Sequence, residues 1–314
     1  MDPPEHTRLR AGLRKHFMPA RVRALEPWIR ELVVGLLEPF ADGGQVEFVE
    51  DFAQPLAMNV GCRVIGLPVS DGDYLRDLVA RFFRREPGQA GMTEDGLGAM
   101  GEMNDYLRRI SAEQRANPPE EPNAISVLRD YRDLEGNALS DDDIGSHLSL
   151  LLIGGTDTLP KVLANLMLRL QQNPDQRAEL AKDSSLAVPA FNEAVRIDMP
   201  TNNMCRLLTR DVERHGVKMS EGQAVVLLYT AANRDEREFP TPDRFDMKRN
   251  PARSLGFSHG HHACIGLHVA RKEGEVAINE ILARFPSYEI DEGGLETYAT
   301  EFVKGYSAMP TRFA

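Results

Sequence analysis

Most of the sequence repeats apolar residues at the 3.6-residue period of an amphipathic α-helix. This period predicts helices over residues 3–16, 22–37, 57–65, 71–84, 96–116 and 141–172, the last being the longest. Strand signals are short and sparse, and they lie at 45–49, at 225–229 and near Tyr288 and Tyr306. The pattern predicts a mainly α fold with small β-sheets.

The 314 residues are expected to form a single domain spanning residues 1–314. A proline-rich loop at 118–122 is too short to be a domain linker. The formal net charge of −11 argues against a general nucleic-acid binder, which needs a basic face. Three scattered cysteines exclude a disulfide framework. The most apolar run, 148–153, is far shorter than the ~20 residues of a membrane span. Because no signal peptide is visible, we expect a cytoplasmic protein.

One long segment, residues 233–263, has little periodicity and contains several prolines and glycines. A structureless stretch of this length inside a domain is usually functional or disordered. It ends in FSHGHHACIG and is followed at once by a helical run over 267–284, which argues against disorder. Cys264 therefore stands at a helix start, where the helix dipole and free N–H groups favour a thiolate. The alternative is a buried cysteine that behaves as a small hydrophobic residue.

The string FSHGHHACIG resembles the haem-ligand loop of the cytochrome P-450 family, with Phe257, Gly260, Cys264 and Gly266 in register. The resemblance extends from residue 1 to residue 314 and is closest to soluble bacterial members. It implies haem b (iron protoporphyrin IX) as cofactor, with Cys264 as the axial ligand of the iron. A cysteine thiolate in this position donates electron density that favours cleavage of the O–O bond.

The long helix contains the string GGTDT, which resembles the oxygen-binding groove of the same family. Asp157 and Thr158 match its acid–alcohol pair, which relays protons to bound oxygen. The glycines and Pro160 are expected to open the helix here, because Pro160 cannot donate to the carbonyl of Thr156. The alternative is a glycine-weakened core helix in which Thr158 bonds its own backbone.

Glu193 and Arg196 stand three residues apart on one predicted helix and so share a face. Most such pairs are weak surface salt bridges. Here they resemble the Glu-x-x-Arg motif of the family, whose third member matches Arg244 in FPTPDRF. The resemblance implies a buried structural triad that holds the irregular loop behind the haem.

Four further residues match family positions that contact the haem propionates through charge-assisted hydrogen bonds. These are His6 and Arg10 in DPPEHTRLR, Arg206 before LLT, and His262 in the cysteine loop. Each of them, taken alone, reads as an ordinary surface charge.

The resemblance also implies a distal pocket for a small hydrophobic substrate, such as a terpenoid, a steroid or an aromatic compound. The matching positions are Leu150, Ile153, Gly154, Asn202, Asn203, Phe302 and Val303. The paired asparagines either recognise an oxygen on the substrate or cap a turn.

The reaction would use O2 and electrons from a ferredoxin-type partner. Residues 1–30 carry seven basic against three acidic residues, which indicates either a solvated helix face or a docking surface for an acidic partner. The docking surface would be extended by Lys248, Arg249, Arg271 and Lys272.

Family members carry a segment before the DPPEH element that supplies the first strands, the first helices and a substrate lid. We expect this chain to lack that segment, which leaves a second reading open: a haem-binding fragment or pseudoenzyme with little turnover. A third reading is a zinc hydrolase built on His259, His261, His262, Cys264 and His268. Their spacing is crowded and no matching Glu general base stands out, so this reading ranks last.

Overall fold

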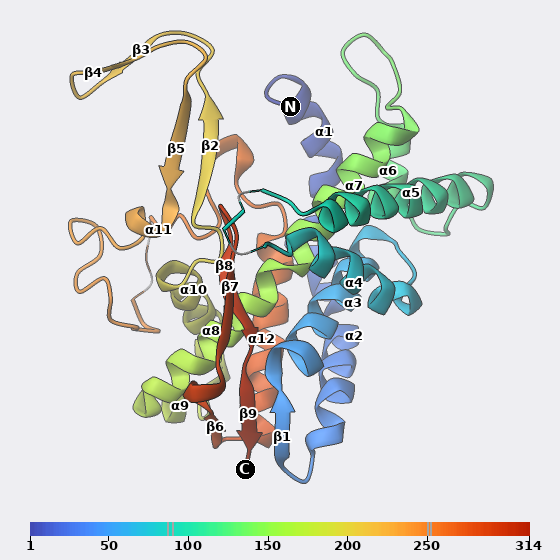
Figure 1. The fold of residues 1–314 in the computed structure, drawn as a ribbon. Helices are drawn as coiled ribbons and strands as arrows, with labels where there is room; N and C mark the ends of the chain where they lie inside the picture. Colours follow the sequence, from blue (N-terminus) through green and yellow to red (C-terminus); the bar gives the residue numbers. More distant parts are fainter. Residues whose placement is uncertain (87, 90, 250, 252) are drawn as a thin grey trace.

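The computed structural model of the chain describes residues 1–86, 88–89, 91–249, 251 and 253–314. Helices dominate it, and short strands lie mostly in the second half of the chain (Figure 1). The helices are α1 (Glu5–Arg14), α2 (Pro19–Leu37), α3 (Gln54–Ile65), α4 (Gly72–Phe83), α5 (Glu94–Ala116), α6 (Ala124–Asp130), α7 (Asp141–Thr156), α8 (Thr158–Gln172), α9 (Pro174–Leu180), α10 (Ala187–Ile197), α11 (Tyr229–Ala232) and α12 (Leu267–Arg284). The mainly α fold is therefore confirmed.

The strands form small antiparallel sheets. They are β1 (Gly44–Glu47), β2 (Asn203–Leu207), β3 (Val212–Arg214), β4 (Val217–Met219), β5 (Ala224–Leu228), β6 (Tyr288–Ile290), β7 (Glu296–Ala299), β8 (Lys304–Ala308) and β9 (Pro310–Phe313). The order β1-β9-β6 joins the first strand to the last, and β2–β5, β3–β4 and β7–β8 are two-stranded pairs. The described strands thus include the small sheets expected from the sequence.

Local sequence explains where several helices begin and end. The Ser140 hydroxyl accepts from the Asp143 N–H (3.1 Å) and the Asp143 carboxylate accepts from the Ser140 N–H (3.3 Å), which forms a capping box at the start of α7. Three aspartates in the first turn of α7 complement the helix dipole. Gly66 ends α3 with a φ of 99°, a conformation that favours glycine.

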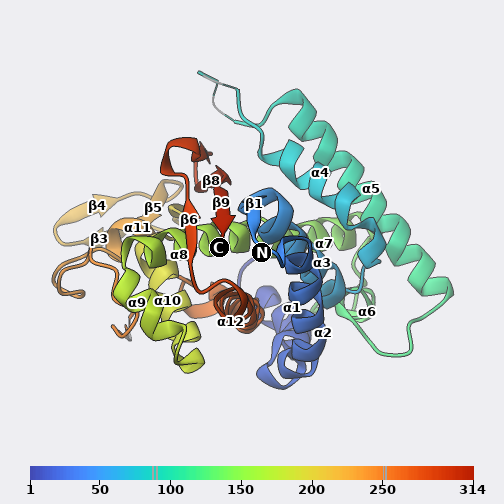
Figure 2. The same cartoon turned by 90° about the horizontal axis from the view of Figure 1, so that it is seen from below.

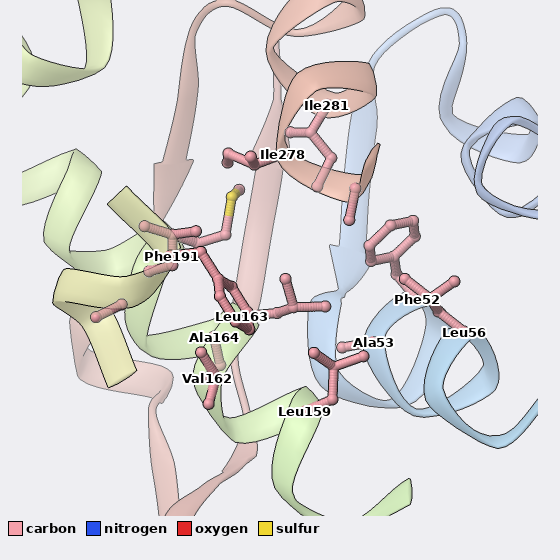
Figure 3. Packing of buried hydrophobic residues seen from close by; sticks show 14 of the residues in the cluster. Phe52, Ala53, Leu56, Leu159, Val162, Leu163, Ala164, Phe191, Ile278 and Ile281 are labelled. Atoms are coloured by element: carbon pink, nitrogen blue, oxygen red, sulfur yellow. The ribbon is translucent and has the colours of Figure 1, made fainter. Parts of the chain in front are cut away.

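Buried hydrophobic side chains form two clusters, and the helix pair α7–α8 contributes to both. One cluster gathers α2, α8, α10 and α12, and the other gathers α3, α4, α5, α6 and α7. Figure 3 shows part of the first, where Leu159 and Leu163 of α8 lie between Phe52 and Phe191. In Figure 2, α4 and α5 lie on one side of the molecule and α9 and α10 on the other. The α7–α8 pair therefore crosses the middle of the fold.

The long helix predicted over 141–172 is interrupted at Asp157, between α7 and α8. Pro160 lies in the first turn of α8 and has no N–H to donate to the Thr156 carbonyl. A Cβ on Gly61 of α3 would stand 2.7 Å from Thr156 Cγ2, so glycine allows α3 to approach the end of α7 closely. The predicted opening of the helix is confirmed by this interruption.

Candidate active site

Cys264 lines a cavity of about 470 Å³ between the α7–α8 pair and α12, called here the Cys264 cavity. The Cys264 N–H donates to the Phe257 carbonyl (2.8 Å), which closes the loop before α12. Gly260 has a φ of 75°, a conformation that favours glycine, so the loop needs glycine there. Gly266 is the N-cap of α12. The loop presents the cysteine to the cavity just before the start of α12.

The environment of Cys264 acts on its thiol in two opposing ways. Cys264 is exposed to the cavity, but desolvation by the surrounding protein raises the pKa of its thiol, while the backbone N–H groups of Gly266 and Leu267 and the charge of Arg10 lower it. A coordinated metal ion deprotonates a thiol outright, so iron would reverse this balance.

The lining of the Cys264 cavity fits a large, flat, apolar group. Val64, Leu151, Leu159 and Val269 contribute apolar side chains, among others. Gly154 and Gly155 also line it, and a Cβ on either would meet no heavy atom within 4 Å, so the cavity is open over this part of α7. An apolar cavity with one cysteine thiol among its described lining residues suits haem iron.

Cationic and imidazole side chains gather near the cysteine loop. The rings of His6 and His262 lie 4.2 Å apart, and His262 Nε2 is 2.8 Å from Asp2 Oδ1. Arg10 donates to the Ala263 carbonyl. The buried His6 Nδ1 has no hydrogen-bond partner among the described residues. The structure therefore brings His6, Arg10 and His262 together around the loop.

Arg206 and Thr158 reach the Cys264 cavity from other elements. Arg206 lies on β2 and lines the cavity, while its side chain donates to the Cys205 carbonyl (2.9 Å). Thr158 lines it from the start of α8, and its hydroxyl donates to the Gly154 carbonyl (3.0 Å). Such a bond to the helix backbone is the expected alternative to a role in the oxygen-binding groove. Thr158 makes this bond and also faces the cavity.

Asp157 does not share the Cys264 cavity with Thr158. It lines a separate cavity of about 670 Å³ bounded by α3, α4, α8 and the β7–β8 hairpin, called here the Asp157 cavity. Neighbouring residues on a helix do not face the same side, which explains the division. The acid–alcohol pair expected from the sequence is thus split between two cavities.

Glu193 and Arg196 form a buried ion pair, with the Arg196 side chain fully buried. The Arg196 Nε and Nη2 donate to the two Glu193 carboxylate oxygens at 2.8 and 2.7 Å. Arg196 also donates to the carbonyls of Asn233 (2.8 Å) and Pro242 (2.9 Å). These bonds anchor the start of the irregular segment to α10.

The third member of this network is Arg249, and the expectation of Arg244 is corrected. Arg249 Nε lies 3.0 Å from Glu193 Oε1, and the same side chain donates to the Arg244 carbonyl (3.0 Å). The Arg244 side chain is exposed and contributes its backbone instead. In a segment without periodicity, spacing alone does not tell which arginine turns inward.

Only two of the expected substrate-pocket residues, Leu150 and Gly154, line the Cys264 cavity. The side chains of Ile153, Phe302 and Val303 pack in or against the second hydrophobic cluster. Asn203 donates its amide to the Glu301 carbonyl (3.1 Å), and the Asn202 N–H donates to the Phe302 carbonyl (2.7 Å). Ile153, Asn202, Asn203, Phe302 and Val303 thus lie outside the lining of the Cys264 cavity, and their contact with substrate stays a prediction.

Glu273 is a site residue that sequence reasoning missed. It lines the Cys264 cavity from α12, and its buried Oε2 has no hydrogen-bond partner among the described residues. Burial raises the pKa of the Glu273 carboxyl well above its usual range. A signal was present, because Glu273 stands four residues after Val269 and four before Ala277, on the buried face of the helix.

Two further structural findings bear on the alternatives. Within the described part of the chain, no group of three or more His, Cys, Asp or Glu side chains is arranged to hold a metal ion. The zinc reading therefore has no support there. The described helices include none that is long and apolar enough to cross a membrane.

Comparison with known proteins gives consistent matches. The family model for Cytochrome P450 matches residues 91–303. The Vitamin D(3) 25-hydroxylase of Pseudonocardia autotrophica is 34% identical over 313 residues, which cover 99% of this chain and 76% of that protein. The Steroid C26-monooxygenase of Mycobacterium tuberculosis is 34% identical over 318 residues, covering 100% of this chain and 84% of that protein.

A solved structure extends the match to the whole fold. HmtN, a post-tailoring hydroxylase involved in himastatin biosynthesis, has a TM-score of 0.90 and 32% identity, covering 100% of this chain and 81% of that one. The architecture, the cysteine loop and the relatives thus agree. Proteins of this kind bind haem b through a cysteine thiolate. The chain belongs to the cytochrome P450 family of monooxygenases.

Proposed function

We propose that the chain is a haem-thiolate monooxygenase with Cys264 as the axial ligand, and that it inserts one atom of O2 into a small hydrophobic substrate. The observation that carries the proposal is the placement of Cys264 and Thr158 in one apolar cavity. Two relatives are named for a vitamin D(3) and a steroid reaction, which supports the steroid member of the expected terpenoid, steroid or aromatic class.

Haem bound by a thiolate supplies the electron donation that favours cleavage of the O–O bond. The chain itself holds and orients this group. Cys264 provides the thiolate, and Arg206 and His262 on the cavity wall, with His6 and Arg10 beside the cysteine loop, are proposed as donors for the two propionates. Apolar side chains make up much of the lining, and filling the cavity with haem and substrate would displace water from it, which limits reduction of oxygen without product formation.

Thr158 is proposed to hold a proton for delivery to bound oxygen. Its hydroxyl needs only to turn away from the Gly154 carbonyl to point its proton into the cavity. We expect Thr158→Ala to retain haem and to consume reductant, but to form more peroxide and about 100-fold less product. The measurement is the ratio of product to reductant consumed, with a panel of steroids, terpenoids and aromatic compounds as substrates.

The matched variant for this test is Thr158→Ser, which keeps the hydroxyl and is expected to keep most of the coupling. Equal coupling in Thr158→Ala and the parent would contradict the role of Thr158. Failure of the parent to oxidise any compound of the panel would contradict the substrate class and favour the pseudoenzyme reading.

We further propose a ferredoxin-type electron donor that docks on α1 and the start of α2. Arg10 links α1 to the cysteine loop, and Arg8, Arg14 and Lys15 nearby are exposed. The residues expected to extend this surface are already engaged: Lys248 with Glu179, Arg249 with Glu193, Arg271 with Asn192, and Lys272 with Glu26 and Glu275. The basic surface is therefore narrower than the sequence implied.

Reduction by an acidic ferredoxin is expected to slow as salt is added, because exposed charges are screened beyond ~8 Å at physiological ionic strength. The double change Arg8→Glu and Arg14→Glu should slow it further at low salt. Stopped-flow reduction measures both effects. Lys182→Glu, an equivalent charge reversal at the end of α9, serves as control, and a salt-independent rate would remove this surface from consideration.

A further inference from the structure

The Asp157 cavity and the Cys264 cavity share the α7–α8 junction as a wall. Asp157 and Lys161 line the first cavity, whereas Gly155 and Thr158 line the second. Among the described residues, the two linings have no residue in common. The Asp157 cavity can therefore hold a molecule of its own while the Cys264 cavity is filled.

One oxygen of the Asp157 carboxylate is already engaged. Oδ1 is 2.5 Å from Lys161 Nζ and accepts from the Tyr298 hydroxyl at 2.6 Å. Burial and the nearby Asp157 charge raise the pKa of the Tyr298 hydroxyl, so Tyr298 stays protonated and remains a donor. Lys161 balances the charge of the carboxylate. A ligand therefore finds no unbalanced charge at this point and no free Oδ1.

The other carboxylate oxygen, Asp157 Oδ2, is buried and has no hydrogen-bond partner among the described residues. Asp157 as a whole is 9% exposed. A buried acceptor without a donor destabilises the folded protein. Because Asp157 lines the cavity, a molecule bound there can supply the missing hydrogen bond. The site therefore selects for a ligand with an O–H or N–H group.

The charged side chains of the cavity wall do not favour an ionic ligand. The arginines are each engaged by a carboxylate: Arg76 by Asp73 (3.3 Å), Arg84 by Asp95 (3.6 Å) and Arg85 by Glu301 (3.2 Å). An anionic ligand finds these charges already neutralised. A cationic ligand finds only Glu86 without a salt bridge among the described residues, and Glu86 is exposed to solvent, where an ion pair contributes little. The cavity therefore suits a neutral ligand.

Apolar side chains form a large part of the same wall, and they include Val49, Met58, Val79, Phe83 and Pro160. Gln54 and Thr300 add neutral polar groups. The volume of about 670 Å³ lies within the range of small-molecule sites, about 300–1,000 Å³. Water alone would satisfy Oδ2 but would leave the apolar side chains wetted, whereas an apolar body buries them. The wall thus matches a hydrophobic molecule with one donor.

We propose that the Asp157 cavity is a second binding site, which takes a neutral alcohol with a hydrophobic body whose hydroxyl donates to Asp157 Oδ2. This inference rests on the proposed function, because insertion of one oxygen atom into a C–H bond of a hydrophobic substrate forms an alcohol of this class. The product formed in the Cys264 cavity thus has a site of its own beyond the α7–α8 junction. Figure 1 shows the β7–β8 hairpin, which supplies Tyr298, beside α8, and β8 packs on that helix.

The first test measures binding while the Cys264 cavity is closed. A bulky azole is bound to the iron of the haem-loaded protein so that it fills the Cys264 cavity, and the shift of the Soret band verifies this. Borneol, a compact terpenoid alcohol, is then titrated by calorimetry and compared with its methyl ether, which keeps the apolar body and the oxygen but has no O–H. We expect borneol to bind, and the ether to bind about 10-fold more weakly. Equal affinities would overturn the proposal.

The second test locates the bound alcohol. Ala80 is an exposed residue of α4 that lines the Asp157 cavity, so Ala80→Trp places a large side chain in it. We expect this variant to lose borneol binding at concentrations that saturate the parent. Ala112→Trp places the same side chain on the exposed face of α5 and should bind borneol as the parent does. Unchanged binding in Ala80→Trp would put the alcohol elsewhere and refute the assignment.

The third test removes the acceptor and keeps its shape. In Asp157→Asn the amide oxygen takes the place of Oδ1, because Lys161 and Tyr298 both donate there. The amide NH2 then stands in place of Oδ2 and can only donate. We expect this variant to bind the methyl ether as tightly as borneol. A preference for borneol that persists in Asp157→Asn contradicts the role of Oδ2, and if the variant does not retain haem, the first two tests decide.

The outcomes separate this site from the proposed function. If the azole shifts the Soret band and borneol does not bind, the cavity holds water only, so the second site is wrong and the proposed function stands. If the azole produces no shift, the proposed function itself fails, and the second site fails with it.

Discussion

Cys264→Ser is expected to abolish the shifted Soret band that the reduced, carbon-monoxide-treated protein shows when a thiolate binds haem iron. A serine hydroxyl is a much weaker donor than a thiolate, so neither the spectrum nor oxygen activation should survive. The measurement is the carbon-monoxide difference spectrum of the purified haem-loaded protein. The expected loss is complete, because within the described part of the chain Cys264 is the only cysteine that lines the cavity.

The other two cysteines provide internal controls. Cys62 is buried in α3, and burial raises the pKa of its thiol to about 12. Cys205 is exposed on β2 and does not line the cavity. Cys62→Ser and Cys205→Ser should therefore keep the parent spectrum. If Cys264→Ser keeps it as well, the ligand is another residue and the proposed function is lost.

Arg196→Leu should give protein that aggregates and holds little haem. Removing one partner of a buried ion pair costs roughly 3–5 kcal/mol; here it leaves the buried Glu193 with Arg249 as its remaining cation and removes the donors to the Asn233 and Pro242 carbonyls. Domains are stable by only about 5–15 kcal/mol, so this loss removes a large part of the total. The expected readouts are the ratio of haem absorbance to protein and the midpoint of unfolding in urea.

Two arginine variants in the irregular segment test whether the third member of the Glu193–Arg196 network is Arg249, as in the structure, or Arg244, as the sequence motif implies. Arg249→Leu removes the guanidinium that bonds Glu193, and should lower haem retention and stability in the same direction as Arg196→Leu. Arg244→Leu changes an exposed side chain and should alter stability by about 0.5 kcal/mol or less. The reverse order of the two variants would restore Arg244 as the structural member.

Periodicity predicted the helices well because their apolar faces are local patterns, as in α2 and α5. The interruption at Asp157 was predictable for the same reason, since Pro160 and the two glycines are backbone signals. Most strands were missed, because β2, β3, β4, β7 and β9 are only three to five residues long, and β9 pairs with β1 near the other end of the chain. Such short elements are determined by tertiary packing more than by propensity.

The site residues show where motif matching reached its limit. The resemblance singled out Cys264 and Thr158, which line the same cavity, but it also joined Asp157 to Thr158, although adjacent helical residues face different directions. Asp157 bonds Lys161 and Tyr298, and neither of these two partners belongs to a recognisable sequence motif. Tyr298 is distant in sequence and reaches Asp157 only because the β7–β8 hairpin packs on α8.

The interruption between α7 and α8 also has a thermodynamic consequence for the uptake of a cofactor. Pro160 lacks an N–H whether or not anything is bound, so the missing helical hydrogen bond is already part of the free energy of the folded chain. The helix does not have to be unwound when the cofactor binds, so the free energy of unwinding does not reduce the affinity for the cofactor. Pre-organisation of this kind raises affinity because the ordering cost is met before association. The interruption in the wall of the Cys264 cavity is thus set by the sequence of the chain and not by binding of the cofactor.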